Sequence, residues 1–362
     1  MTKYYMYLPE AFSLILFLLI ILLVPAWRKF YFFPNNQGEK ELRKGKRIEY
    51  YDFLKGLAIF AVVIIHMAWF YAHLKPDFEY NYFFVLVNAL TRFAIGVFFI
   101  CSGLLLGPWE EVNGKAKFFS RKVSRIFFPY FLVMLLMGLY FKSSILGFVY
   151  MLLNGTALVP YYFVTVLLQL YLVYPLVSKY RRSKYFLSIS FVISFVSTVV
   201  LGGVTIFGAW LFTNFFFFFA YGMHMRDFFL GEGKFGRKEM KFWFWVLVMY
   251  FLFVIFLPSF YYNARFFYAL AVFNILYFYR RKIKKHFISF YEFLIKTGRV
   301  SLWIFLIHFQ IGYFVSDIVF DYNLNFCLEY PLILIITFFS SFGLSLALSS
   351  LYNLLLRQFL IK

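Results

Sequence analysis

The sequence contains little charge and almost no cysteine. Only 14% of its 362 residues are Asp, Glu, Lys or Arg, whereas 63% are hydrophobic. A water-soluble fold of this size would show shorter apolar stretches with a regular period, so the composition argues against one. The two cysteines, Cys101 and Cys327, lie in apolar surroundings and belong to no CxxC motif or His/Cys cluster. We expect both to be small core residues, and they indicate neither a metal site nor a redox centre.

Long apolar runs repeat along the whole chain. Each run has about 17–25 residues, the length that a helix needs to cross ~30 Å of hydrocarbon. We therefore predict an all-α polytopic membrane protein with about 11 transmembrane helices. The first run ends in Trp27-Arg28-Lys29 and not in a cleavage site with small residues, so we interpret it as an anchor. The expected spans are residues 8–26, 52–72, 82–106, 126–148, 157–177, 185–201, 205–223, 241–258, 262–279, 300–320 and 330–355.

Positive charge is distributed unevenly between the loops. The formal net charge is +20, and alternate loops and the C-terminal tail contain 30 of the 36 Lys and Arg residues. Such an excess is typical of cytoplasmic loops, so we predict that the N-terminus lies outside and that the C-terminus is cytoplasmic. The basic loops are expected to contact anionic membrane lipid, and nucleic acid is not an expected partner.

A polar linker separates the first predicted span from the others. Residues 30–47 are charged and contain Pro34-Asn35-Asn36-Gln37-Gly38. We therefore predict an extra N-terminal transmembrane helix with a basic cytoplasmic linker in residues 1–46. A membrane domain with the other spans is expected to occupy residues 47–362. The expected location is the cell membrane.

Lys55 and His66 are ionisable residues within one apolar run. Eleven residues correspond to about three helical turns plus 20°, so both side chains point the same way, about 16 Å apart along the axis. Asp52 lies one turn before Lys55 on nearly the same face. Ionisable groups inside a membrane are costly, so these residues indicate a polar pathway or a reactive site. The alternative is a buried histidine bonded to a neighbouring helix and a lysine that extends to the membrane surface.

Other basic residues occur within or beside the predicted spans. Arg92 lies about ten residues inside a span, where it needs a partner or a water-filled cavity. Arg121 and Arg125 are four residues apart and should share one side of a helix that enters from the cytoplasm. They suit either a positively charged anchor or a clamp for phosphate groups. For His308, a second histidine within a span, the sequence favours neither a core role nor a site role.

Taken together, these segments resemble the acyltransferase-3 family of integral membrane O-acyltransferases over residues 47–355. Lys55 stands where the family pattern has Arg, as in branches similar to sugar O-acetylases, and Tyr161-Tyr162 replaces a Trp of the family. The matching features, in chain order, are Arg47 before Asp52-x-x-Lys55-Gly56, the ten-residue gap to His66, Arg92-Phe-Ala-Ile, Phe98-Phe99-x-x-Ser102-Gly103, Arg121-Lys122-x-x-Arg125, Pro175, Gly222 and Ser301…Leu306-Ile307-His308.

The resemblance implies transfer of an acyl group, commonly acetyl, from cytoplasmic acyl-CoA to a hydroxyl of a cell-surface or lipid-linked glycan. Acyl-CoA is then a donor substrate, with no tightly bound cofactor and no metal expected. The residues would have three roles. Those expected to be catalytic are His66, Arg92 and Asp52; those expected to bind CoA are Lys55, Arg121, Lys122 and Arg125; those expected to bind the acceptor are Tyr162 and His308.

A transporter or flippase for a polysaccharide or a lipid-linked sugar is the competing hypothesis, because it also needs many spans and buried polar groups. Such a protein is expected to have helices broken by Gly or Pro at paired positions of two halves, and the sequence shows no such pairing. A purely structural subunit is disfavoured because it leaves Asp52, Lys55, His66 and Arg92 unexplained.

The charge distribution makes a prediction about topology. In a chain whose own two cysteines are replaced, Lys285→Cys should not react with an impermeant maleimide added to intact cells, because its loop is predicted to be cytoplasmic. The same cysteine should react after the cells are permeabilised. Labelling of Lys117→Cys or Lys285→Cys in intact cells would contradict the orientation.

Overall fold

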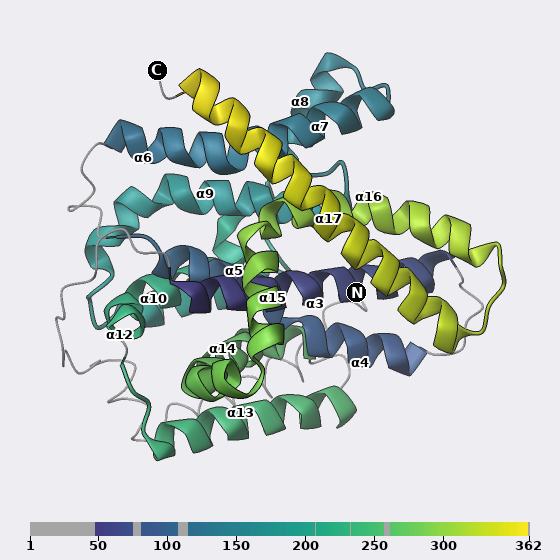
Figure 1. Cartoon of the computed structure of the whole chain (residues 1–362). Coiled ribbons are helices and arrows are strands. Elements are labelled where there is room, and N and C mark those ends of the chain that lie inside the picture. Colours follow the sequence, from purple (N-terminus) through teal and green to yellow (C-terminus); the bar gives the residue numbers. More distant parts are fainter. Residues whose placement is uncertain are drawn as a thin grey trace, which may run out of the picture. The chain divides into compact units, whose positions relative to one another are not determined.

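The computed structural model describes residues 48–74, 81–107, 115–206, 208–231, 233–256 and 261–360, which are mostly helical (Figure 1). Contacts within the chain divide it into two units. Among the described residues, unit 1 comprises those in 95–119 and 165–283, and unit 2 those in 48–94, 120–164 and 284–360. The predicted separation at residues 46 and 47 stays a prediction, because residues 1–46 lie outside the described residues.

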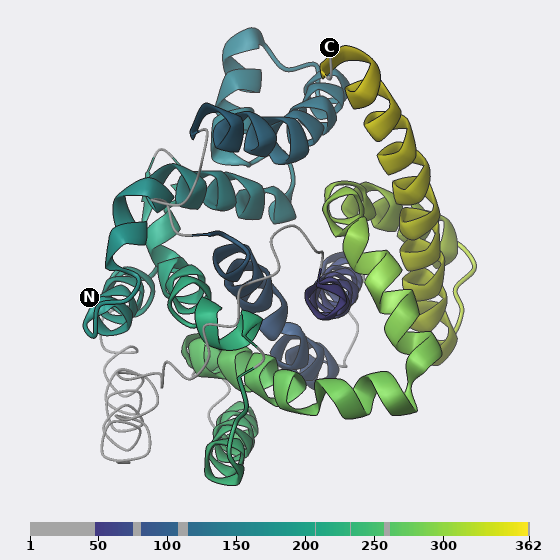
Figure 2. The same cartoon turned by 60° about the vertical axis from the view of Figure 1, so that its left-hand side comes forward.

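Unit 2 is built around helix α3, which spans Glu49–Leu74. Helices α15, α16, α17 and α4 all pack against α3. Figure 2 shows α3 in dark purple, nearly end-on, with α15 and α16 in light green and α17 in yellow beside it. The helices of unit 2 besides α3 are α4 (Asn81–Thr91), η2 (Val123–Phe127), α7 (Phe128–Tyr140), α8 (Ile145–Asn154), η3 (Val159–Tyr161), α15 (Ile288–Arg299), α16 (Ser301–Phe320) and α17 (Phe326–Leu360).

Two glycines let α3 and α15 approach until their backbones touch. A Cβ atom added to Gly298 would lie 1.8 Å from the carbonyl oxygen of Asp52. One added to Gly56 would lie 2.0 Å from the carbonyl oxygen of Leu294. Small residues at helix crossings allow such close packing in membrane proteins. The crossing places the C-terminal turn of α15 beside the N-terminal part of α3.

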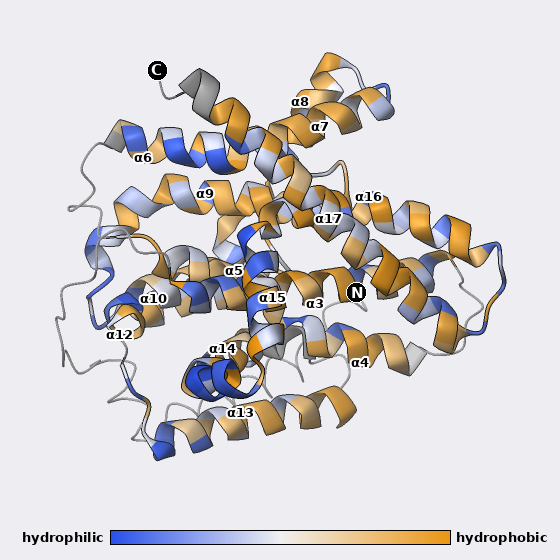
Figure 3. Ribbon diagram, viewed as in Figure 1, coloured by the Kyte–Doolittle hydropathy of each residue, from blue (hydrophilic) through white to orange (hydrophobic). Residues whose placement is uncertain are grey.

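Helices α16 and α17 form an antiparallel pair joined by a short loop, and both contact α3. Figure 3 shows that α16 is largely apolar along its length and that the loop to α17 is hydrophilic. Two hydrogen bonds join α17 to the second half of α3. Tyr330 Oη of α17 donates to the carbonyl of Ile64 at 3.2 Å, and Tyr71 Oη of α3 donates to the buried carboxylate of Glu329. These contacts hold α3 at positions on both sides of His66.

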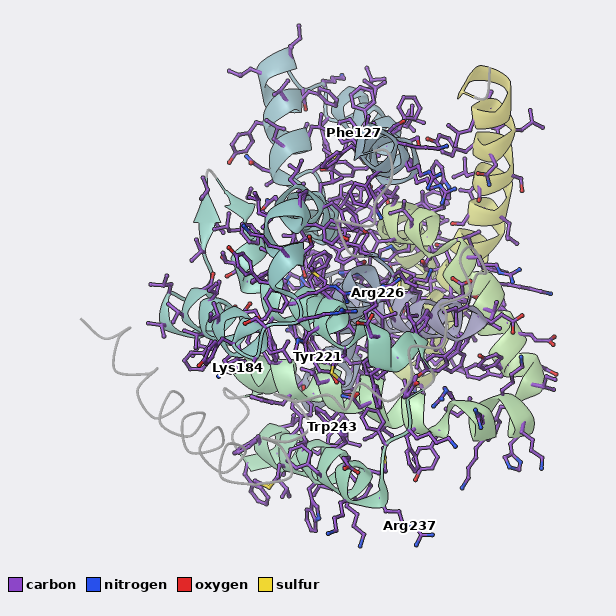
Figure 4. The ribbon with its side chains drawn as sticks, turned by 90° about the vertical axis from the view of Figure 1, so that its left-hand side faces the viewer. Phe127, Lys184, Tyr221, Arg226, Arg237 and Trp243 are labelled. Atoms are coloured by element: carbon purple, nitrogen blue, oxygen red, sulfur yellow. The ribbon has the colours of Figure 1, made fainter. Side chains whose placement is uncertain are left out.

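Unit 1 contains most of the remaining helices. Its aromatic interior includes Tyr221 of α11, which is fully buried, whereas Arg237 at the start of α13 points away from the protein (Figure 4). The elements that lie wholly or mostly in unit 1 are α5 (Phe93–Leu104), α9 (Tyr162–Val177), η4 (Ser178–Tyr180), α10 (Phe186–Phe195), η5 (Val196–Val200), β1 (Thr205–Ile206), β2 (Ala209–Trp210), η6 (Phe212–Asn214), α11 (Phe216–His224), α12 (Arg226–Leu230), α13 (Arg237–Phe256) and α14 (Tyr261–His286). Helix α6 (Lys115–Lys122) has residues in both units.

The prediction of one spanning helix over residues 205–223 is wrong. An antiparallel hairpin pairs Thr205 with Trp210, and the helix α11 begins only at Phe216. The buried side chain of Asn214 stabilises this loop, because its amide nitrogen donates to the carbonyl of Val204 at 2.7 Å and its oxygen accepts from the Val204 amide at 3.0 Å. Hydropathy does not detect such a hairpin, since its residues are as apolar as those of a helix.

Seven helices among the described residues are long and apolar enough to cross a membrane. They confirm an all-α chain with several candidate spans. The seven are Glu49–Tyr71, Phe83–Leu104, Ala116–Tyr140, Val159–Tyr180, Arg237–Phe256, Ser301–Phe320 and Phe326–Leu356.

The remaining predicted spans have different outcomes. Residues 8–26 lie outside the described residues, and residues 185–201 form a shorter apolar helix, Phe186–Val200. Helix α14 covers residues 262–279 but is not among the seven, since polar residues such as Asn274 lower its hydropathy. The total of eleven spans and the orientation stay predictions.

The two cysteines differ from each other. Cys101 is buried, which confirms the expected core position, whereas Cys327 is exposed, so that prediction is wrong. The reason is that Cys327 lies in the first turn of α17, directly after the loop that follows α16. An apolar sequence context does not distinguish an exposed helix end from a core position.

A network of ionic contacts joins the segment after α9 to α12 in unit 1. Asp227 lies 3.3 Å from Arg181 and 3.1 Å from Arg182, and Arg181 is buried. Burial raises the pKa of Asp227, but the charges of the two arginines outweigh it and bring the pKa below its ordinary value. In Figure 4, Arg226 marks the position of α12.

The glycine contact between α3 and α15 predicts a difference between two Gly→Ala variants. Gly298→Ala should lower the free energy of unfolding by about 1–3 kcal/mol, because the added methyl group meets backbone that must shift. Gly343→Ala is the matched control, since nothing lies within 4 Å of its added Cβ. The control should be neutral or more stable by up to about 1 kcal/mol, because Ala favours helix. Equal unfolding of the two purified variants would contradict the close contact.

Asp227 predicts a pH-dependent contribution to stability. Its folded pKa is lowered, so the contribution is present at neutral pH and is lost as the pH falls below the ordinary aspartate range of about 4. Asp227→Asn should therefore melt at a lower temperature than the parent at pH 7. The difference should shrink as the pH is lowered from about 5 towards 3. A difference in melting temperature that does not change with pH would show that the carboxylate charge is not the cause.

Candidate functional site

Helix α3 positions three of the predicted site residues. It is continuous from Glu49 to Leu74, so the expected helical spacing of Asp52, Lys55 and His66 is confirmed. Lys55 and His66 are therefore about 16 Å apart along the axis, and Asp52 is about 21 Å from His66. Asp52 and His66 consequently cannot act on the same atom. The catalytic role expected for Asp52 stays a prediction, and its position does not favour that role.

The structure brings the two intramembrane histidines together. His66 Nδ1 lies 2.8 Å from His308 Nε2, although the two residues are 242 positions apart in the sequence. His308 comes from α16 and is fully buried, whereas His66 is only half-buried. Of the pair, His66 is thus the histidine that a substrate can reach.

Hydrogen bonds within the pair determine which nitrogen of His66 is basic. His308 Nδ1 lies 3.0 Å from the carbonyl oxygen of Ile304 and 2.9 Å from that of Phe305. A carbonyl oxygen only accepts, so His308 Nδ1 carries the hydrogen, and Nε2 of a neutral His308 is an acceptor. His66 Nδ1 must then donate to it. This leaves the lone pair of His66 on Nε2, where it can accept a proton from a substrate.

Side chains from α16 and η3 surround the pair. Phe309 packs edge-on against His66 with a centroid distance of 5.5 Å. The buried Tyr161 donates to the carbonyl oxygen of Leu306 at 2.7 Å and accepts from Gln310 Nε2. Tyr161 therefore contacts α16 on both sides of His308 in sequence. These contacts hold in place the part of α16 that carries His308, the hydrogen-bond partner of His66.

Arg92 lies at a turn between α4 and α5, where the predicted span bends. The preceding Thr91 donates its hydroxyl to the carbonyl oxygen of Val87 at 2.7 Å, a bond that often bends a helix. Arg92 itself is half-buried. It belongs to unit 2 and follows α4, which packs against α3. A catalytic role for Arg92 stays a prediction.

Asp52 links two cations at the other end of α3. Its carboxylate lies 2.7 Å from Lys55 Nζ and 3.9 Å from Arg299 Nε. Asp52 is buried, while Lys55 is half-buried and Arg299 is exposed. The charges on the outer side of this cluster are therefore positive. A nearby pair, Lys284 with Glu49 at 3.0 Å, lies one turn earlier on α3.

Arg121 and Arg125 flank the start of a π-helical turn, η2. Pro129 follows four residues after Arg125 and has no N–H to donate, which explains why the regular α-helical bonding is interrupted here. Phe127 at the end of this turn is labelled in Figure 4. Both arginines are exposed, and Lys122 between them is half-buried.

The π-helical turn η2 is connected through Tyr352 to the end of unit 2 that carries Arg299. Tyr352 of α17 donates to the carbonyl oxygen of Ser124 within η2, and its ring lies 5.6 Å from that of Trp303. Trp303 is in the first turn of α16, four residues after Arg299. The three basic residues of η2 and α6 and the cations beside Asp52 therefore occur at the same end of unit 2.

Sequence reasoning missed several residues that the structure places at the site. In the sequence, Arg299 is one of many basic loop residues, and Gln310 has no signal beyond its position near His308. Of the tyrosine pair, the sequence favoured Tyr162, which is half-buried, but Tyr161 makes the contacts to α16. Acceptor binding by Tyr162 and His308 stays a prediction. Among the described residues, no group of three His, Cys, Asp or Glu side chains could hold a metal ion.

Comparison with known families identifies the chain. A family model described as an acyltransferase domain, that of the acyltransferase-3 family, matches residues 48–350. The chain belongs to the acyltransferase-3 family. No curated protein and no solved structure matches it. Family membership and the seven long apolar helices among the described residues together make this a multi-pass membrane acyltransferase. The sugar O-acetylase-like branch stays a prediction.

Proposed function

We propose that the protein transfers an acyl group, with acetyl expected, from cytoplasmic acyl-CoA to a hydroxyl of a cell-surface or lipid-linked glycan. The observation that supports this proposal is the hydrogen bond between His66 and His308 inside a chain of the acyltransferase-3 family. A histidine whose tautomer is set by a buried partner is suited to general-base catalysis. The proposed location is the cell membrane, with the donor on the cytoplasmic side.

In the proposed reaction, His66 Nε2 removes the proton of the acceptor hydroxyl as its oxygen attacks the thioester carbonyl. The C–S bond then breaks, and the imidazolium of His66 returns the proton to the departing thiolate, which gives the acyl ester and CoA. His308 accepts a hydrogen bond from His66 Nδ1 throughout and stabilises the imidazolium. His308 is then a positioning residue, a role different from the acceptor binding expected from the sequence.

The other predicted residues have binding roles in this scheme. Arg92 would stabilise negative charge that develops on the thioester oxygen. Lys55, Arg121, Lys122 and Arg125 would bind the phosphates of CoA at the cytoplasmic end of unit 2. Tyr162 would contact the acceptor. The rise of about 16 Å between Lys55 and His66 is similar to the reach of an extended pantetheine arm.

A series of histidine variants tests the mechanism. His66→Ala should lower acyl transfer by about 10²–10⁴-fold, which is the usual effect of losing a general base. His308→Leu should also be strongly impaired, because it removes the acceptor for His66 Nδ1. His308→Gln should retain more activity than His308→Leu, since its amide oxygen can accept that bond. The measurement is product ester formed by purified protein from labelled acyl-CoA.

His73→Ala is the matched control, because His73 is an exposed histidine on the same helix. It should transfer acyl groups at the parental rate. Normal activity of His66→Ala would exclude His66 as the base. A parental protein that moves a lipid-linked sugar across vesicles but forms no ester would favour the transporter hypothesis.

A further inference from the structure

The cluster of Asp52, Lys55 and Arg299 has a layered arrangement. The side chain of Asp52 is only 3% exposed, that of Lys55 is 23% exposed and that of Arg299 is 48% exposed. The carboxylate therefore lies beneath the two cations. A ligand approaching from the solvent would meet an ammonium group and a guanidinium group before it meets the carboxylate.

The bonding of Arg299 leaves its terminal nitrogens available to a ligand. Its Nε faces Asp52 at 3.9 Å, and its two terminal nitrogens have no hydrogen-bond partner among the described residues. A guanidinium group can donate two parallel bonds to an oxyanion, whereas an ammonium group acts as a compact point charge. Arg299 and Lys55 together thus offer the donors that a phosphate group needs.

The backbone contact between α3 and α15 holds the two cations in place. Gly298 directly precedes Arg299, and its Cα approaches the carbonyl group of Asp52. Gly56 directly follows Lys55 and approaches the backbone of Leu294. The two cations are therefore attached at a rigid crossing, which lowers the cost of ordering them around a ligand.

We propose that Lys55 and Arg299 bind the diphosphate group of a CoA-type donor and that Asp52 positions both cations. This inference rests on the proposed function, because the donor class comes from it. The diphosphate is attached to the far end of the pantetheine arm. With the thioester at His66, an arm of similar length to the 16 Å rise brings the diphosphate to Lys55. Asp52 is then a positioning residue that does not take part in the chemical step.

Ligand analogues that lack parts of CoA test the assignment. The affinities of CoA, dephospho-CoA and pantetheine are measured by titration calorimetry on the full chain in zwitterionic nanodiscs. Arg299→Gln should weaken CoA and dephospho-CoA equally, by about 10–100-fold, because charge-assisted hydrogen bonds to the diphosphate are lost. Pantetheine has no phosphate, so its affinity should change less than about twofold. Lys55→Gln should show the same selectivity.

Two further variants separate this role from a structural one. Lys285→Gln removes an exposed positive charge that precedes α15, the helix of Arg299, and should leave the affinities of CoA, dephospho-CoA and pantetheine unchanged. Asp52→Asn should weaken CoA binding in the parent but add little when Lys55 and Arg299 are both replaced by Gln, because Asp52 acts through these two cations. Equal weakening of pantetheine and CoA by Arg299→Gln, or no weakening of CoA, would overturn the assignment.

Two outcomes distinguish this inference from the proposed function and from lipid binding. If the variants change the affinities as expected but the parent forms no ester, the proposed function fails and the diphosphate site stands. If Arg299→Gln alters only the retention of an anionic phospholipid added to the nanodiscs, the cations bind a lipid headgroup and the assignment to CoA is wrong.

Discussion

The contact between the backbones of α3 and α15 is the constraint on which the proposed donor site depends. Gly56 and Gly298 have no Cβ atoms, so the two helices approach until a carbonyl of each lies where the other's Cβ would be. Helix α3 carries residues of both candidate centres, with Lys55 near one end and His66 three turns further along. A rigid helix cannot change this separation, so placing one end beside α15 also determines where His66 lies relative to the donor.

The second decisive interaction is the bond between His66 and His308. It depends on α16, whose own backbone carbonyls determine the tautomer of His308 and through it the basic nitrogen of His66. Tyr161 hydrogen-bonds to Leu306 and Gln310 and holds this part of α16 in place. In a membrane interior, where unpaired polar groups are costly, the bond to His308 lowers the cost in stability of retaining a reactive histidine.

The sequence predicted some parts of the fold well because they depend on local properties. Seven of the predicted apolar runs correspond to helices of spanning length in the described part of the chain, and helical periodicity correctly placed Lys55 and His66 on one face. The prediction of a spanning helix over residues 205–223 was wrong, because a hairpin of apolar residues has the same hydropathy as a helix. The side chain of Asn214 stabilises the hairpin. The prediction that Cys327 is a core residue was wrong for a related reason, since an apolar neighbourhood in the sequence does not show whether a helix end is buried.

Composition and local spacing were enough to predict the all-helical membrane class, the resemblance to the acyltransferase-3 family and the order of chemical groups along α3. These properties depend on composition and on residues a few positions apart. The contact of His66 with His308 and the contact of Arg299 with Asp52 become apparent only in the folded chain. Each of these contacts links residues more than 200 positions apart, and periodicity within one helix carries no information about which other helix packs against it. The glycines at the helix crossing permit the approach, but their effect is visible only when both backbones are in place.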